Sequence, residues 1–198
     1  MAKKANKKKR RCKGKGSSFE RTLCRQLSLW WTHGNRDDVF WRTAGSGAMA
    51  TTRIKKQRAS FGQHGDIQAV DPIGQPLLDV FSIEAKRGYT GATLSNILDA
   101  GPQMKPQLVK FIEQARTSQL ESGAWSWLLI RKRDQRHTTV LFPFYVVSKL
   151  SLLGLDHISF RSSNEIGGTK RIIQIKLDDF LNAVPPKRIR KIGKSHDK

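Results

Sequence analysis

Glu84 and Lys86 place an acid and an amine two residues apart in Leu77–Lys86, a stretch whose residue types predict a β-strand. Side chains alternate between the two faces of a strand, so both groups should project from the face that also carries Val80 and Ser82. Such a lysine can orient or deprotonate a metal-bound water, or stabilise the charge that builds on phosphorus. The triplet alone is common on solvated strand edges, so the interpretation requires further acids nearby.

Two further acids are expected close to this pair. Asp66 follows Gly65 and opens Asp66–Val70, which predicts a strand, and the turn sequence Asp71–Gly74 predicts a β-hairpin with the strand that carries Glu84. Glu20 falls among the apolar positions of a predicted helix, which is an unusual place for a carboxylate. Two or three gathered carboxylates repel one another unless a hard cation joins them, and Mg²⁺ accepts a few carboxylates together with waters and phosphate oxygens.

The first helix is predicted to begin at Ser17 and to run to Trp31, because Ser17 and Glu20 have the spacing of a capping box. Its apolar stripe consists of Phe19, Leu23, Cys24, Leu27, Trp30 and Trp31. The capping box offers a structural reason for Glu20, and the same residue can also serve a metal site.

The rest of the chain alternates between predicted strands and helices. Strands are predicted at Val39–Arg42, Trp125–Arg131, Thr138–Phe142 and Arg171–Leu177, and helices from Pro106 to about Glu121, at Phe144–Leu153 and at Asp178–Ala183. This order predicts an α/β fold with a central mixed β-sheet flanked by helices. Three polar residues are left out of the site: Asp71 fits a turn cap, Asp79 is expected on the face opposite Glu84, and Gln114 stands about 120° from the apolar Leu108 around its helix.

The charge of the chain points to a polyanion as its partner. The chain has a net charge of +21 and a pI near 10.6. Its length of 198 residues indicates one domain. Nine basic residues and no acid lie in 1–15, and six basic residues and one acid lie in 187–198. Both segments are predicted to be disordered basic tails around a domain at 16–186. No membrane span or signal peptide is expected, and two cysteines suit a reducing cytosol.

A loop of small residues at Thr43–Ala48, followed by the basic stretch Arg53–Arg58, could bring the backbone close to a phosphate. The expected contacts to nucleic acid are Arg42, Ser46, Arg53, Lys55, Lys56 and Arg58.

Gly65-Asp66, the eighteen-residue step to Glu84 and the triplet Glu84-Ala85-Lys86 together resemble the PD-(D/E)xK nuclease superfamily. The closer likeness is to archaeal-type Holliday-junction resolvases and small phage endonucleases. It includes KGSSFER at 15–21, which is similar to the helix start of those resolvases, and RTAGSG at 42–47, which is similar to their glycine-containing loop. The likeness covers roughly residues 15–131. Gly65 replaces the proline of the superfamily's name, and residues 44–66 form a longer segment than the resolvases have.

The resemblance implies a restriction-endonuclease-like core in which Asp66 and Glu84 bind Mg²⁺, with Mn²⁺ as a substitute. It further implies that Lys86 is catalytic and that Glu20 completes the catalytic set. The reaction would be endonucleolytic hydrolysis of DNA, either at branched substrates such as Holliday junctions in recombination or on plain duplex. The enzyme would act as a monomer or a homodimer, in the cytoplasm of a bacterial host if phage-encoded. The alternative is a non-catalytic basic nucleic-acid-binding protein, in which converging acids would repel the phosphates.

Overall fold

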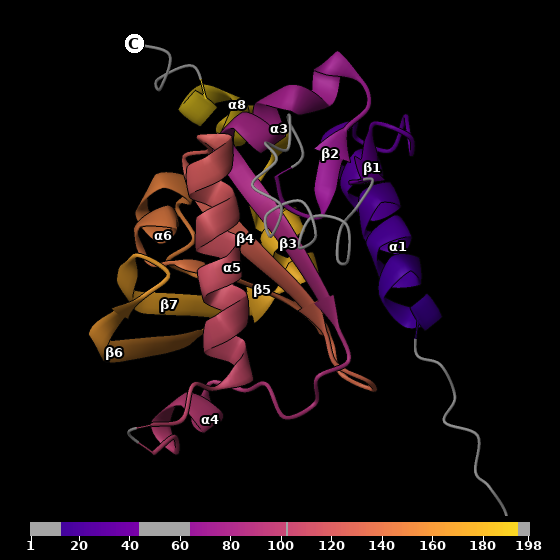
Figure 1. Ribbon diagram of the computed structural model, residues 1–198. Helices are drawn as coiled ribbons and strands as arrows, with labels where there is room; N and C mark the ends of the chain where they lie inside the picture. Colours follow the sequence, from indigo (N-terminus) through magenta and orange to yellow (C-terminus); the bar gives the residue numbers. More distant parts are fainter. Residues whose placement is uncertain (1–12, 44–63, 102, 194–198) are drawn as a thin grey trace, which may run out of the picture.

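Five strands form the central sheet of the computed structural model, which describes residues 13–43, 64–101 and 103–193 (Figure 1). Their order across the sheet is β3-β4-β5-β7-β6, with β3 parallel to β4 and the other neighbours antiparallel. The strands are β3 (Phe81–Arg87), β4 (Ser126–Lys132), β5 (Thr138–Pro143), β6 (Ile158–Ile166) and β7 (Thr169–Lys176). The predicted α/β fold with a central mixed sheet is confirmed.

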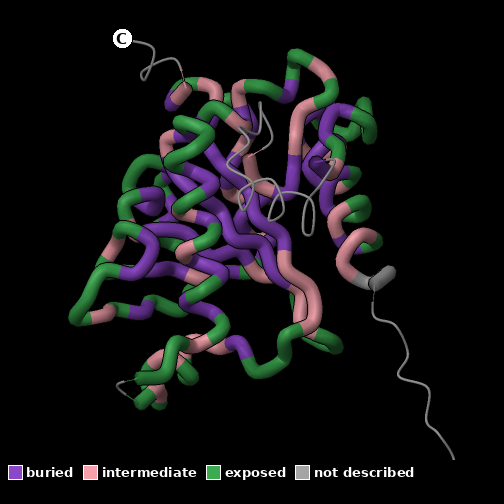
Figure 2. The backbone as a smooth tube through the Cα atoms, in the orientation of Figure 1, coloured by how far each residue is buried: buried purple, intermediate pink, exposed green. Residues whose placement is uncertain are grey.

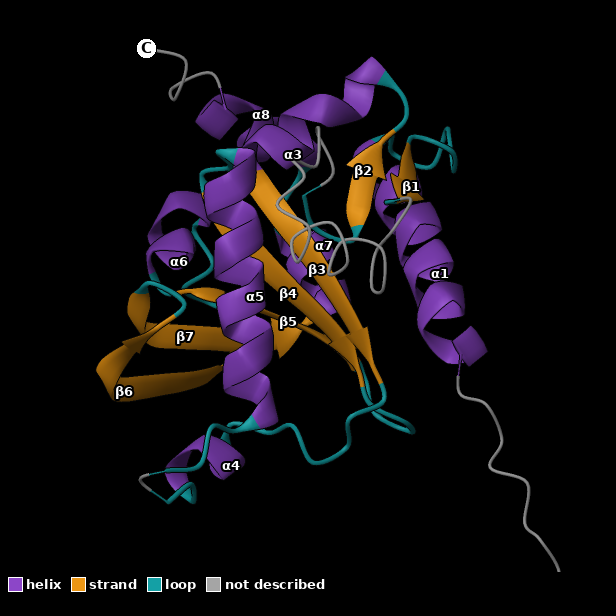
Figure 3. Cartoon of the chain, viewed as in Figure 1, coloured by secondary structure: helices purple, strands orange, loops and turns teal. Residues whose placement is uncertain are grey.

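Helices cover both faces of this sheet (Figure 3). On one face, α5 (Gln107–Ser122) buries Leu108 and Ile112 against Trp127 and Leu129 of β4. The core on the opposite face is built with α1 (Lys13–Trp31), α6 (Tyr145–Leu150), α7 (Leu177–Ala183) and α8 (Pro186–Gly193). Strands β3 and β4 lie between these layers and are buried over most of their length (Figure 2), so any polar group on them is largely removed from water.

Helix α1 buries the stripe that its sequence predicts, with Leu23, Cys24 and Trp31 almost completely inaccessible to solvent. Its beginning differs from the prediction, because the helix already includes Lys13. Ser17 and Glu20 therefore lie within the helix and do not cap it. A glycine inside a helix costs only about 1 kcal/mol relative to alanine, so the glycines in this first turn need not end the helix.

The predicted hairpin between Asp66–Val70 and the strand of Glu84 is wrong. Strand β2 (Ile67–Ala69) instead pairs antiparallel with β1 (Phe40–Arg42), and helix α3 (Gln75–Val80) separates β2 from β3. A proline lies in the first turn of α3, and the side chain of Gln75 donates to Asp79 one turn later at 2.8 Å. Buried Leu77 and Val80 are three residues apart, a spacing that fits a helix as well as the alternation read from the sequence.

Two predicted turn signals are confirmed. Asp71 caps the 3₁₀ helix η1 (Pro72–Gly74) by accepting a hydrogen bond from the backbone N–H of Ile73 at 2.9 Å. Gly123 ends α5 with a φ of 72°, a left-handed conformation that glycine adopts without strain. Pro106 lies immediately before α5, one position earlier than expected.

Two longer elements were not predicted from the sequence, the edge strand β6 and helix α8. The expected disorder from residue 187 is wrong for residues 187–193, which belong to α8. Ile189 and Ile192 of this helix are buried in the core, whereas its basic side chains Lys187 and Lys191 are exposed. A short helix, α4 (Ser95–Leu98), precedes α5. Within the described ranges, none of the helices combines the length and apolarity that crossing a bilayer requires.

Candidate active site

Glu84 and Lys86 meet on the face of β3 that α5 covers. The Nζ of Lys86 donates to Oε2 of Glu84 at 2.7 Å, which confirms that the two side chains share one face. Glu84 is only 2% exposed, and the ring of Phe111 from α5 lies 6.0 Å from the Lys86 ammonium. The ion pair therefore lies in a largely dehydrated pocket, where charge–charge interactions are stronger than in water.

Asp66 reaches the same pair from the residue just before β2. Its backbone N–H donates to the carbonyl of Ile83 at 2.9 Å, which anchors this segment to β3. Its side-chain Oδ2 accepts hydrogen bonds from the backbone N–H of Ala85 at 2.8 Å and from Nζ of Lys86 at 3.2 Å. Lys86 thus bridges two buried carboxylates, and the predicted proximity of Asp66 to Glu84 and Lys86 holds although the predicted hairpin does not.

The backbone conformation at Gly65 explains why a proline does not stand at this position. Its φ is +76°, whereas the proline ring fixes φ near −65°. A Cβ at this position would also lie 2.8 Å from the carbonyl oxygen of Ile83. The close approach of the two backbones, which delivers Asp66 to β3, therefore requires glycine.

Helix α5 supplies two further partners that the sequence interpretation missed. Ser118 donates to Oε1 of Glu84 at 2.8 Å, and Gln114 donates to Oε2 at 2.9 Å. The helical wheel places Gln114 away from Leu108 and so predicts no role for it in the site, yet its long side chain reaches Glu84 on β3. The available signal was the four-residue spacing of Gln114 and Ser118, which places both on one side of a helix.

Burial and charge shift the acid–base properties of the pair in a consistent way. Desolvation, followed by repulsion from Asp66, raises the pKa of Glu84 from its ordinary value of 4.5 to about 7. Burial disfavours the charged form of Lys86, but attraction to Asp66 and Glu84 outweighs this effect and raises the pKa of the amine. Glu84 therefore loses its proton less readily than an exposed glutamate does. A cation in addition to Lys86 would favour its charged form.

Glu20 lies at the edge of this region and is paired with another residue. Its Oε2 is 3.0 Å from Nε of Arg42 on β1. Desolvation, followed by the charge of Glu20, raises the pKa of the buried Cys24 thiol to about 12, and Asp66 contributes in the same direction. Glu20 and Asp66 therefore both influence the same buried thiol. Within the part of the chain that the structure describes, no three His, Cys, Asp or Glu side chains form a group that could hold a metal ion.

The donor set of Asp66 and Glu84 nevertheless fits Mg²⁺. This ion commonly uses one or two carboxylates and keeps waters and substrate phosphate oxygens as its remaining ligands. Asp66 and Glu84 raise the pKa of Lys86 although burial alone would lower it, so the place that the two carboxylates share favours positive charge.

Five of the predicted nucleic-acid contacts lie outside the described residues, namely Ser46, Arg53, Lys55, Lys56 and Arg58. Arg42 is described, and its partner in the structure is Glu20. A contact between Arg42 and a phosphate remains a prediction.

A central mixed sheet that carries Glu84 and Lys86 on β3, with Asp66 brought to them from the segment before β2, is the arrangement expected of the PD-(D/E)xK nuclease class. A family model described as "Phage putative PDDEXK endonuclease" matches residues 11–191, and the chain belongs to this family. The match extends from the beginning of α1 into α8, so it covers strand β6 and most of helix α8, the two elements that were not predicted. No curated protein and no solved structure matches the chain significantly.

Proposed function

We propose that this protein is a metal-dependent endodeoxyribonuclease that hydrolyses phosphodiester bonds with Asp66, Glu84 and Lys86 as its catalytic residues. The observation that carries the proposal is the bridge of Lys86 between two carboxylates, each no more than 5% exposed. The single ammonium of Lys86 leaves an excess of negative charge on the two carboxylates, and burying such an excess costs several kcal/mol unless a further cation compensates it.

Each residue has a distinct role in this proposal. Asp66 and Glu84 would hold Mg²⁺, or Mn²⁺ in its place, which supplies Lewis-acid chemistry to the scissile phosphate and its attacking water. Lys86 donates hydrogen bonds from a fixed ammonium, so it would stabilise negative charge that develops on a phosphoryl oxygen. Ser118 and Gln114 fix the orientation of the Glu84 carboxylate. Glu20 would support the bound metal or its water, and its carboxylate is held by an ion pair with Arg42.

DNA is the proposed substrate because the chain is strongly basic and belongs to an endonuclease family. The alternative, a basic protein that only binds nucleic acid, does not account for Asp66 and Glu84. Their negative charges would repel a phosphate and weaken simple electrostatic binding. Membership in a phage family supports the cytoplasm of a bacterial host as the compartment in which the enzyme would meet its DNA.

The form of DNA that we propose to test first is branched, and in particular the four-way junction of recombination. Support comes from the resemblance of residues 15–21 and 42–47 to Holliday-junction resolvases. Symmetric cleavage of such a junction would suit a homodimer, because a twofold axis presents the same site to two equivalent strands.

A substrate panel tests the proposal. The full-length protein is incubated with four-way junctions, flaps, linear duplex and single strands, each with Mg²⁺ or with excess EDTA. We expect cleavage with Mg²⁺, with junctions cut fastest, and none with EDTA. Equal rates on junctions and linear duplex would contradict the preference for branched DNA but leave the nuclease assignment intact. Cleavage that persists in excess EDTA, or binding without cleavage of any substrate, would contradict the assignment itself.

A further inference from the structure

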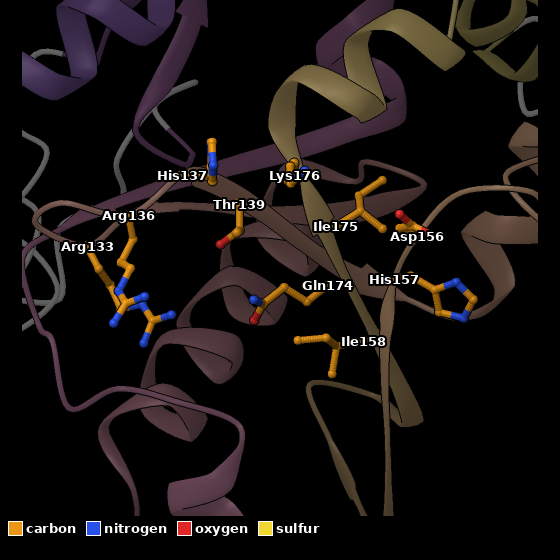
Figure 4. A pocket seen from close by; sticks show the side chains of 10 residues that line it. All are labelled: Arg133, Arg136, His137, Thr139, Asp156, His157, Ile158, Gln174, Ile175 and Lys176. Carbon is orange, nitrogen blue, oxygen red and sulfur yellow. The ribbon is translucent and has the colours of Figure 1, made fainter.

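A cationic region lies on the same face of the sheet as the active site. It is a cavity of about 350 Å³ bounded by the turn between β4 and β5, by β7 and by the segment before β6 (Figure 4). The register of the strands places Thr139, Gln174 and Lys176, which line it, on the same face as Glu84. The cavity contains none of the residues assigned to catalysis.

Positive charge dominates the lining of this cavity. Arg133, Arg136 and Lys176 contribute to it, and Asp156 is the one carboxylate among its lining residues. In the described chain, neither Arg133 nor Arg136 makes an ion pair, and Lys176 reaches Asp179 only at 4.0 Å. Figure 4 shows Arg133 and Arg136 among the side chains that line the cavity. Guanidinium groups that line one cavity suit an anion that both can bind.

A row of side chains connects the cavity with the active site. Lys86, Arg131, Thr139 and Lys176 are successive partners across β3, β4, β5 and β7, and paired residues of neighbouring strands share a face. Three strand spacings of ~4.8 Å separate Lys86 from Lys176, so the row is about 14 Å long. That distance equals the axial rise of about four nucleotides in one strand of duplex DNA.

Arg131 in this row is unusually buried for an arginine. It is 5% exposed, and its Nη1 is buried with no hydrogen-bond partner in the described part of the chain. Burial, assisted by repulsion from Arg133, lowers the pKa of Arg131 to about 10. A buried cation without a partner is costly, and a phosphate nearby would offset that cost.

We propose that the cavity formed by Arg133, Arg136 and Lys176 binds a backbone phosphate of the DNA about four nucleotides from the bond that is cut, and that Arg131 attracts the intervening backbone. This inference rests on the proposed nuclease function and adds the path of the substrate across the sheet. The contact would be independent of sequence, since phosphate contacts position DNA but carry no base information.

The test compares two double variants of the full chain that each lose two positive charges. Arg133→Gln with Arg136→Gln removes the cavity's two guanidinium groups. Lys149→Gln with Arg161→Gln is the matched control, because both side chains are exposed and lie away from the cavity. Helix α6, which carries Lys149, packs on the opposite face of the sheet, and Arg161 alternates with the buried Phe160 on β6.

Binding of labelled duplex is measured in EDTA over a range of salt concentrations, and single-turnover cleavage is measured with Mg²⁺. Each lost phosphate contact reduces the slope of log K against log salt by about 0.9. The cavity variant loses its contact with one phosphate, so its slope should fall by about 0.9, and the slope of the control should change much less. The half-saturating protein concentration should rise in the cavity variant, while the saturating rate stays near that of wild type.

Equal salt slopes for the two double variants, with a cleaving wild type, would overturn the cavity proposal and leave the nuclease function in place. A wild type that neither binds nor cleaves DNA would instead refute the function on which it rests. Inorganic phosphate at constant ionic strength distinguishes a free anion from DNA. If it protects wild type against thermal unfolding, but not the cavity variant, and the DNA slopes are equal, the cavity binds free phosphate and the DNA path is wrong.

Discussion

Replacement of Glu84 by glutamine should change how the stability of the metal-free protein depends on pH. Glutamine resembles the protonated form of Glu84 and can still interact with Ser118 and Gln114. In the folded wild type the pKa of Glu84 is raised to about 7 by burial and by Asp66, whereas its ordinary value is 4.5. The folded state therefore binds this proton more tightly than the unfolded state does, and the associated stability is lost as the pH rises from about 4.5 to about 7.

The size of the effect follows from these two values. One pH unit corresponds to about 1.4 kcal/mol, so the wild type should lose on the order of 3 kcal/mol across this interval from Glu84 alone. Glu84→Gln should not lose it. The stability of the variant relative to wild type should therefore rise by about 3 kcal/mol between pH 4.5 and pH 8, and any constant offset from altered hydrogen bonds will not affect this slope.

The assay is urea unfolding in EDTA at several pH values. Glu165→Gln is the control, because it makes the same chemical change at an exposed position of β6 and should keep a constant difference from wild type. Parallel stability curves for wild type and Glu84→Gln would refute the electrostatic description of the site. Added Mg²⁺ should stabilise wild type more than the variant at pH 8, since binding to the folded state alone adds stability.

Three further substitutions test the supports of the site and the extent of the core. Gly65→Ala should destabilise the protein by about 1–3 kcal/mol and slow cleavage, because alanine is strained at a φ of +76° and its Cβ would meet the carbonyl of Ile83; wild-type stability and rate would contradict this. Ser118→Ala should cost about 1–3 kcal/mol in EDTA at pH 8, where the lost hydrogen bond is to charged Glu84, and less at pH 5; a cost independent of pH would argue against that bond. Ile189→Ala should cost about 2–4 kcal/mol in urea unfolding, whereas Lys187→Ala should change stability by less than about 0.5 kcal/mol; equal values would show that α8 is not part of the core.

Local patterns in the sequence are enough to predict the pairing of Glu84 with Lys86 on β3, but not the elements that surround this pair. The alternation of a strand is enough to place Glu84 and Lys86 together, and the ion pair confirms it. Asp66 was expected at the same place through a hairpin that does not form. The actual link is the hydrogen bond of its backbone to Ile83, which becomes possible because Gly65 lets two backbones approach closely. No local pattern contains that contact.

Long-range packing accounts for what the sequence interpretation missed. Gln114 and Ser118 belong to the site only because α5 lies across β3, a relationship that a helical wheel cannot contain. Helix α8 was not predicted because its basic composition is typical of a disordered tail. The available signals were the three-residue spacing of Ile189 and Ile192 and the position of Pro186 in the first turn, where proline is common. Strand β6 is an edge strand that buries few side chains, so it lacks the alternation that would identify it.

The most direct test of the central claim is single-turnover DNA cleavage with Mg²⁺ by Lys86→Met beside Asp79→Asn. Lys86→Met keeps the length of the side chain and removes the ammonium that bridges Asp66 and Glu84. Asp79→Asn changes an acid on α3 outside the site, where Gln75 is its partner. We predict that Lys86→Met loses at least about 1,000-fold in saturating rate, as expected when a preorganised group is removed from a developing charge, while it folds and binds DNA normally and Asp79→Asn cleaves like wild type. A folded Lys86→Met variant that cleaves DNA at the wild-type rate would contradict the assignment of this site.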